Sequence, residues 1–137
     1  MKVLLDEGAF LPERAHETDA GMDLRTRYAV SIWPGHSVSF DTGVHVQLPH
    51  GTFGKVESKS GLNMNHSIVV CGGVIDEGYT GSIVVKLYNF GDRVYRFKAG
   101  DKIAQLIVQP YLAPDLEVVD SLEATERGDN GFGSTGR

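Results

Sequence analysis

Apolar and polar residues alternate along much of this chain in short stretches. The segment Val44-His45-Val46-Gln47-Leu48 shows the period of two that is typical of a half-buried β-strand. The residues just before it, Ser37-Val38-Ser39-Phe40, alternate in the same way. Turn-forming pairs such as Pro34-Gly35 and Gly100-Asp101 separate the stretches. Further strands are predicted at residues 3–5, 28–32, 52–57, 68–70, 83–89, 93–97, 103–108 and 116–119.

No window of the sequence keeps the 3.6-residue period of an amphipathic helix over three turns, and only one short helix is predicted, at 62–65. Many short strands at close spacing favour an all-β fold, which is a β-sandwich, a jelly roll or a barrel. From about residue 124 the composition changes, and 127–137 contains four glycines and no aliphatic residue. Because such a segment buries too little apolar area to order itself, we expect one domain at 1–123 and a mobile, glycine-rich C-terminal segment at 124–137.

The chain has 137 residues, the size of one domain, and a formal net charge of -5. A mildly acidic chain is poorly suited to long nucleic acid, whose phosphates require many Lys and Arg side chains, although a few convergent cations can bind one small anion. Cys71 is the only cysteine, which excludes an intrachain disulfide and a cysteine-based zinc site. No apolar run approaches the ~20 residues of a membrane span, and Asp6 comes too early for a signal peptide. We therefore expect a cytoplasmic protein that binds neither membranes nor nucleic acid.

Two segments have residue types that suit phosphate. Ser58-Lys59-Ser60-Gly61, after a predicted strand, offers a cation, two hydroxyls and a backbone N–H. The run Arg127-Gly128-Asp129-Asn130-Gly131-Phe132-Gly133-Ser134-Thr135-Gly136-Arg137 combines glycines, hydroxyls and two arginines with a phenylalanine that can stack on a base. Taken alone, a polar surface turn and a frayed terminus are the simpler interpretations of these segments.

A third segment, 69–81, contains the candidate catalytic residue. Two short apolar runs, Val69-Val70-Cys71 and Val74-Ile75, lie on either side of Gly72-Gly73 and look like a hairpin with a bare backbone. Asp76 follows the second run directly, and a partly desolvated carboxylate there can act as a general base or, more simply, form a turn. Glu77 would point away from Asp76 on extended backbone, so no acid–base pair of these two is predicted. Tyr79 is either core packing or one wall of a pocket.

Two further polar positions interrupt predicted strands. Gln105 shares a strand face with Ile103 and Ile107, and a buried amide must find hydrogen-bond partners on a neighbouring strand or on a ligand. Asp23 and Arg25 also share a strand face, and an ordinary salt bridge between them explains both equally well. The five histidines show no spacing typical of metal ligands.

Together and in this order, these segments resemble the five sequence motifs of the trimeric dUTPase family, from Ala20-Gly21-Met22-Asp23-Leu24 to Gly131-Phe132-Gly133-Ser134-Thr135-Gly136. The likeness spans nearly the whole chain. It implies a jelly-roll β-barrel and a homotrimer whose three active sites are each assembled from all three subunits. It also implies Mg²⁺-dependent hydrolysis of dUTP to dUMP and pyrophosphate, which limits uracil incorporation into DNA and supplies dUMP for dTMP synthesis.

The resemblance further implies roles for individual residues. Asp76 would orient and deprotonate the water that attacks the α-phosphorus. Asp23 would contact Mg²⁺ through water, while the three phosphates chelate the metal. Tyr79 would pack under the deoxyribose and exclude a 2′-hydroxyl. Backbone groups of Val70, Gly73 and Val74 would read the uracil edge, the phosphate chain would be held by Lys59, Ser60, Gly61 and Gln105, and a closing lid would supply Arg127, Phe132, Gly133, Ser134 and Thr135.

Two residues depart from the family pattern. Lys59 stands where the family usually has Arg, which replaces a two-pronged phosphate contact with a point charge. Asn130 stands where Gly is usual, and Asn tolerates a left-handed backbone. One alternative is a dCTP deaminase of the same fold, but that family usually has an Arg-Ser-Ser run with a downstream Glu and lacks the glycine-rich lid. A nucleotide-binding regulatory relative is a second alternative, against which the intact Asp76, Tyr79 and Phe132 argue.

Overall fold

The computed structural model describes residues 1–130, and strands dominate this part of the chain. They are β1 (Lys2–Leu5), β2 (Met22–Arg25), β3 (Val30–Ile32), β4 (Ser37–Asp41), β5 (Val44–Gln47), β6 (Thr52–Glu57), β7 (Ile68–Val70), β8 (Val74–Ile75), β9 (Val84–Asn89), β10 (Tyr95–Phe97) and β11 (Lys102–Pro110). One helix, α1 (Ser60–His66), is present among these residues. The all-β prediction is confirmed, and β6 and β7 have the bounds that the sequence predicts.

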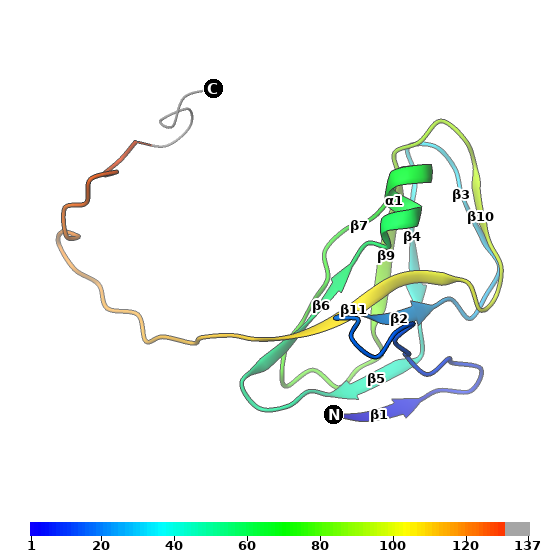
Figure 1. The fold of residues 1–137 in the computed structure, drawn as a ribbon, viewed down its shortest axis with the longest axis horizontal. Coiled ribbons are helices and arrows are strands. Elements are labelled where there is room, and N and C mark those ends of the chain that lie inside the picture. Colours follow the sequence, from blue (N-terminus) through cyan, green and yellow to red (C-terminus); the bar gives the residue numbers. More distant parts are fainter. Residues whose placement is uncertain (131–137) are drawn as a thin grey trace.

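The strands of residues 1–130 form four antiparallel sheets. The largest has the strand order β2-β11-β6-β8, and a three-stranded sheet has the order β4-β9-β7. β1 pairs with β5, and β10 pairs with β3, as two-stranded ribbons. Figure 1 shows these two ribbons at different ends of the body, with β6, β11 and β2 crossing between them.

The core is a single cluster of apolar side chains to which all four sheets contribute. On β9, Val85 and Leu87 are buried while Val84 and Lys86 are exposed, as the period of two requires. Each fully buried aliphatic side chain stabilises the fold by roughly 1.5–3 kcal/mol relative to an exposed one. The other fully buried apolar side chains of large volume are Leu24, Ile32, Val44, Ile68, Ile83, Ile103 and Leu106.

The helix α1 is short and depends on its packing. Leu62 packs against the core cluster, and no residue of the helix is completely buried. Ser67 ends the helix in the left-handed conformation with φ 54°, and its N–H donates to the Asn63 carbonyl oxygen at 2.9 Å. Seven residues are too few to form a stable helix without tertiary contacts. No helix in residues 1–130 is both long and apolar enough to cross a membrane.

The prediction of a hairpin around Gly72-Gly73 is wrong. β7 pairs with β9 and β8 pairs with β6, so the two strands belong to different sheets. Gly73 has φ 123° and lies so close to β6 that an added Cβ would be 2.6 Å from the Val56 carbonyl oxygen. The Val56 N–H donates to the Gly73 carbonyl oxygen at 2.7 Å. The glycine pair therefore carries the chain from one sheet to the other.

Residues 111–130 follow β11 and lead away from the body in Figure 1; we call them the C-terminal arm. The predicted strand at 116–119 is wrong, because this part of the single chain forms no strand. The arm leaves apolar side chains uncovered, with exposed fractions of 94% for Leu116, 100% for Val118 and 88% for Leu122. A strand needs a neighbour for its backbone groups, and within one chain the arm has no ladder to join.

Asn89 is fully buried, and its amide joins three segments. Its Nδ2 donates to the carbonyl oxygens of Ile32 at 2.9 Å and Arg93 at 2.8 Å, and its Oδ1 accepts from the Gly91 N–H at 2.9 Å. Since Asn89→Ala leaves these groups unpaired, we expect the free energy of unfolding in urea to fall by ~2–4 kcal/mol. The exposed Asn63→Ala should change it by less than ~0.7 kcal/mol. Equal losses in both variants would contradict this role of Asn89.

Candidate active site

Asp23 lies buried on β2 and accepts hydrogen bonds from two lysines. Lys102 Nζ is 2.6 Å from one carboxylate oxygen, and Lys59 Nζ contacts the other. The Asp23 side chain is 5% exposed, whereas the side chains of Lys59 and Lys102 are 28% and 38% exposed. Burial raises the pKa of Asp23, but the hydrogen bonds and charges of Lys102 and Lys59 outweigh it and hold the pKa below its usual value. The cluster therefore presents two partly exposed ammonium groups side by side.

Lys102 is the member of this cluster that sequence reasoning missed. The predicted alternative, a salt bridge from Asp23 to Arg25, does not form, because Arg25 donates instead to the Gly100 carbonyl oxygen at 2.7 Å. The register between β11 and β2 shifts between Lys102 and Ala104, which breaks the simple alternation of side chains along β11. No local pattern in the sequence reveals such a register shift.

Gln105 joins the lysine cluster from β11, where it lies opposite Asp23. Its Nε2 donates to the Ser58 carbonyl oxygen at 3.1 Å, so the half-buried amide has a protein partner. The Ser58 hydroxyl oxygen in turn accepts from the Val70 N–H at 2.9 Å. Ser58 thus connects two predicted site residues, Gln105 and Val70, to the segment that carries Lys59.

Ser60 and Gly61 open the first turn of α1, directly after Lys59. Both are exposed, and the helix has no side-chain cap at its start. The first N–H groups of a helix have no acceptor within the helix. The backbone at these two residues therefore offers donors next to the lysine cluster.

Asp76 lies on a separate part of the surface. It is exposed and comes directly after the buried Ile75, at the end of β8. It lines a cavity of about 350 Å³ together with Phe53, Val74 and Tyr111. The Phe53 and Tyr111 rings meet edge to face, with their centroids 6.5 Å apart. An exposed carboxylate at the rim of an aromatic-walled cavity is accessible to a ligand.

Glu77 has partners other than Asp76. Its carboxylate lies 2.8 Å from His50 Nδ1 and accepts from the Gly51 N–H and the Tyr111 hydroxyl, each at 3.0 Å. These hydrogen bonds, led by the one from His50, lower the pKa of Glu77. The network ties the Asp76 loop to the turn before β6 and to the start of the C-terminal arm.

Tyr79 belongs to the same loop and is not core packing. Its side chain is 44% exposed, and its N–H donates to the Asp76 carbonyl oxygen at 3.0 Å. Its hydroxyl donates to the Ser82 carbonyl oxygen at 2.9 Å. Of the two interpretations that the sequence left open, the exposure of the ring excludes core packing, and the wall of a pocket stays a prediction.

Within one chain, the lysine cluster and Asp76 lie toward opposite ends of β6. Gly54 pairs with Ile75, one residue before Asp76, whereas the other end of β6 leads directly to Ser58 and Lys59. A strand rises about 3.3 Å per residue, so the four steps from Gly54 to Ser58 span roughly 13 Å. The single chain therefore does not unite its candidate base with its candidate phosphate-binding residues.

The predicted lid lies largely beyond the part of the chain that the structure describes. Arg127 is on the exposed C-terminal arm, where its Nε donates to the Asn130 carbonyl oxygen at 3.1 Å. Phe132, Gly133, Ser134 and Thr135 fall outside the described residues. Their predicted roles stay predictions.

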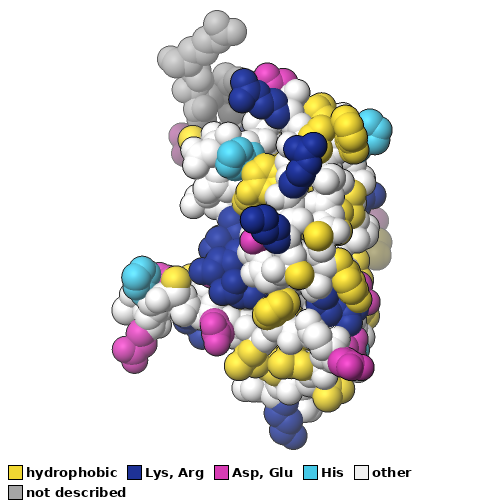
Figure 2. All heavy atoms as spheres, turned by 90° about the vertical axis from the view of Figure 1, so that its right-hand side faces the viewer, with side chains coloured by type: hydrophobic (Ala, Val, Ile, Leu, Met, Phe, Trp, Pro, Cys, Tyr) yellow, Lys and Arg dark blue, Asp and Glu magenta, His cyan; other side chains and the backbone are white. Residues whose placement is uncertain are grey.

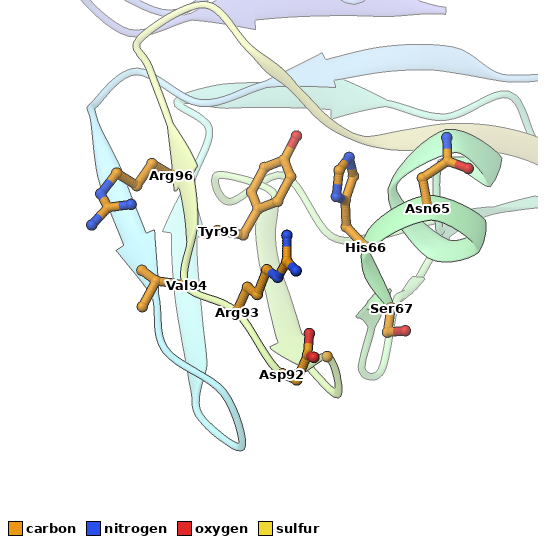
Figure 3. A pocket seen from close by; sticks show the side chains of 9 residues that line it. Asn65, His66, Ser67, Asp92, Arg93, Val94, Tyr95 and Arg96 are labelled. Carbon is orange, nitrogen blue, oxygen red and sulfur yellow. The ribbon is translucent and has the colours of Figure 1, made fainter.

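A larger cavity of about 650 Å³ lies between the end of α1 and the turn from β9 to β10. Figure 3 shows the side chains of His66, Arg93 and Tyr95 next to one another there, and the centroids of the His66 and Tyr95 rings are 4.7 Å apart. Figure 2 looks onto the side of the body that carries β3 and β10 and shows several Lys and Arg side chains on it. None of the predicted site residues within 1–130 lines this cavity. Cations are favourable at the C-terminal end of a helix, which accounts for Arg93 without a ligand.

Residues 1–130 contain no group of three His, Cys, Asp or Glu side chains that could hold a metal ion directly. Asp23 fits an indirect contact. A carboxylate has about four acceptor positions, and the two ammonium groups take one on each oxygen, so each oxygen keeps a lone pair that could accept from a metal-bound water. Asp23 therefore suits a metal ion that is chelated mainly by a bound small molecule and that contacts the protein through water.

Comparison with known proteins decides the family. The family model described as dUTPase matches residues 7–136. The chain belongs to the dUTPase family. A mouse deoxyuridine 5'-triphosphate nucleotidohydrolase is 44% identical over 135 residues, which cover 98% of this chain and 83% of the mouse protein. A Clostridium novyi protein of the same name is 42% identical over 141 residues, and the match covers 99% of this chain and 99% of that protein.

Solved structures of dUTPases have the same fold. A dUTPase variant from Staphylococcus bacteriophage 80alpha with dUpNHpp matches with a TM-score of 0.93 at 30% identity, covering 99% of this chain and 98% of the phage chain. A variant from phage phi11 of S. aureus, described for its coordination of a structural Mg(II) ion, matches with a TM-score of 0.83 at 31% identity, covering 90% and 98%. The dUTPase type of β-barrel that the resemblance implies is confirmed.

Asp23→Asn should lower the free energy of unfolding by ~1–3 kcal/mol, because the two lysines lose their shared charged acceptor. The exposed Asp92→Asn is the matched control and should change it by less than ~0.5 kcal/mol. The folded pKa of Asp23 lies below its usual 3.8, so its stabilisation is present above pH 3.8 and is lost as the pH falls through the folded value. Urea unfolding at a series of pH values should show wild type and variant converging below about pH 4. A constant difference at all pH values would contradict the assignment.

Proposed function

We propose that this protein carries out the dUTPase reaction, the hydrolysis of dUTP to dUMP and pyrophosphate, with Asp76 as its general base. The observation that carries the assignment of the base is the position of Asp76, an exposed carboxylate directly after a buried strand end, on the rim of a cavity. The relatives named as deoxyuridine 5'-triphosphate nucleotidohydrolases support the reaction, since one of them is covered along 99% of its length.

In the proposed mechanism, Asp76 accepts a proton from a water molecule as the water oxygen attacks the α-phosphorus. The bond from the α-phosphorus to the bridging oxygen breaks, and that oxygen leaves with the pyrophosphate. The proton resides on Asp76 until products depart. A general base contributes about 10²–10⁴-fold to such a rate.

Lys59 and Lys102 neutralise the triphosphate in this proposal. Each ammonium group has three donors, and Asp23 uses one of them. Gln105 keeps one of its two amide donors free after bonding to Ser58. The exposed N–H groups of Ser60 and Gly61 complete the set of donors. Lys102 is an addition to the residues that the family resemblance implies.

We place Mg²⁺ on the phosphate chain, in indirect contact with Asp23. When bound, the metal supplies charge neutralisation at the phosphate oxygens. Asp23 would accept from a water bound to the metal, while it holds the two lysines in place. The phage phi11 relative, described with a structural Mg(II) ion, shows that a protein of this family binds the metal.

We infer that the active enzyme is a homotrimer with shared sites. Two observations support an assembly of several chains. The lysine cluster and Asp76 lie apart along β6 in one chain, so a complete site needs Asp76 of one subunit beside the lysines of another. The C-terminal arm leaves Leu116, Val118 and Leu122 almost fully exposed, which a partner can cover. The number three comes from the family resemblance.

The remaining assignments concern the nucleoside and the lid. Tyr79 packs under the deoxyribose, the backbone of Val70, Gly73 and Val74 reads uracil, and the 124–137 segment, with Arg127, Phe132, Gly133, Ser134 and Thr135, closes over the bound nucleotide. Support comes from the exposure of Tyr79 and Val74 beside Asp76. We expect the enzyme in the cytoplasm, although one human relative is named as mitochondrial.

Asp76→Asn should bind dUTP with unchanged affinity in calorimetry and release pyrophosphate ~10²–10⁴-fold more slowly, because the amide cannot take the proton. Wild type and the exposed control Asp92→Asn should prefer dUTP over UTP, dTTP and dCTP in the same assay with Mg²⁺. Normal turnover in Asp76→Asn would remove Asp76 as the base. Preference of wild type for another nucleotide would refute the proposed reaction itself.

Deleting residues 127–137 should leave the assembly intact and reduce kcat by at least ~100-fold, because the lid is gone while residues 111–126 remain. Sedimentation equilibrium measures the assembly, for which we expect three times the mass of the chain. Undiminished turnover of the truncated enzyme would dismiss the lid, and a monomer in the full-length sample would dismiss the shared site.

A further inference from the structure

The Tyr79 ring is held against its own loop. Its hydroxyl reaches across Gly81 to the Ser82 carbonyl oxygen at 2.9 Å. A Cβ on Gly81 would lie 2.5 Å from the Tyr79 hydroxyl oxygen and 2.6 Å from the ring carbon that carries it. Carbon atoms in favourable contact are about 3.5–4.0 Å apart, so any side chain at position 81 displaces the ring.

Ser82 is itself fixed to the body of the protein. Its hydroxyl donates to the Asp41 carboxylate and accepts from the Gly43 N–H at 3.0 Å. Asp41 is also paired with Arg27 at 3.0 Å. The corner between β4 and β5 therefore determines, through Ser82, where the Tyr79 ring lies.

We propose that Gly81 and Ser82 are positioning residues that hold the Tyr79 ring as the wall against which the sugar of the nucleotide is selected. This inference rests on the proposed function, in which Tyr79 packs under the deoxyribose. It adds two residues that make no contact with the substrate. They act only through the position of one aromatic ring.

Two consequences of the geometry produce selection. The ring already touches Gly81, so it has no room to retreat from a sugar that carries a 2′-hydroxyl. The single donor of the Tyr79 hydroxyl is used by the Ser82 carbonyl, so it is not available to stabilise that 2′-hydroxyl. The Tyr79 ring can neither move away from the ribose 2′-hydroxyl nor donate a hydrogen bond to it. The enzyme therefore discriminates against UTP, because its buried 2′-hydroxyl stays unpaired.

Gly81→Ala tests the proposal by pushing the ring out of place. We expect KM for dUTP to rise about tenfold, kcat to change by less than about threefold, and the dUTP-to-UTP ratio of kcat/KM to fall about tenfold. Thr80→Ala, at the neighbouring exposed residue of the loop, is the matched control and should behave as wild type. An unchanged KM and ratio in Gly81→Ala would overturn the inference.

A double-mutant cycle separates positioning from general damage to the loop. In a Tyr79→Ala background, Gly81→Ala should alter neither KM nor the nucleotide ratio further, since the ring through which it acts is gone. Additive losses in the double variant would overturn the inference. Ser82→Ala removes the anchor without adding volume and should shift the ratio in the same direction by about threefold, which keeps the test decisive if Gly81→Ala folds poorly.

A crystal structure of nucleotide-free Gly81→Ala should show the Tyr79 ring displaced and its bond to the Ser82 carbonyl broken. This measurement does not require activity, so it distinguishes the two hypotheses. Failure of the wild-type enzyme to hydrolyse dUTP refutes the proposed function and, with it, the selection of the sugar, but it leaves the positioning of the Tyr79 ring by Gly81 and Ser82 intact. A ring that stays in place in Gly81→Ala refutes the positioning role alone.

Discussion

The pairing of β6 on both of its edges determines where every candidate site residue lies. On one edge β6 pairs with β11 from Gln105 to Pro110, and on the other it pairs with both residues of β8. A shift of register by one residue would turn each strand's side chains to the opposite face. The same strand therefore sets Gln105 beside Ser58 at one end and Asp76 beside its cavity at the other. Both candidate groups are rigid because their common support is paired on two sides.

The sequence predicts the elements whose signals are local. The alternation at 44–48 and the apolar run at 68–70 become strands because each residue's exposure follows from its position in the pleat. Ser58, Lys59 and Gln105 were singled out by residue type, and the structure does bring them together. The local pattern is sufficient where the residues of a strand alone, and not its pairing partner, determine that the strand forms and which of its side chains are buried.

Features that depend on distant partners were missed or predicted wrongly. The two short apolar runs around Gly72-Gly73 have the same pattern whether they pair with each other or with strands of two different sheets, so the hairpin was wrong. The network of Glu77 joins residues 50, 51 and 111, which nothing in the sequence relates. The segment 116–119 has the apolar content of a strand but lacks a neighbour within one chain.

The structure also shows a physical consequence of having Lys59 where the family usually has Arg. A guanidinium facing Asp23 would take both carboxylate oxygens in a two-pronged contact. The compact ammonium of Lys59 takes one oxygen and leaves the other to Lys102. Two point charges, one just before α1 and one on β11, thus stand where one planar cation is usual, and each can follow the phosphate chain on its own flexible stem.

If the proposed homotrimer covers the exposed leucines and valines of the C-terminal arm, the stability of this protein depends on its concentration as well as on its sequence. If only association covers them, mass action links the thermal midpoint to protein concentration, and dilution weakens the fold. In the proposed homotrimer, a newly synthesised copy that has not yet assembled would carry an extended apolar segment, which is the kind of surface that chaperones and proteases engage first. The abundance of the protein would then depend on how quickly its copies assemble.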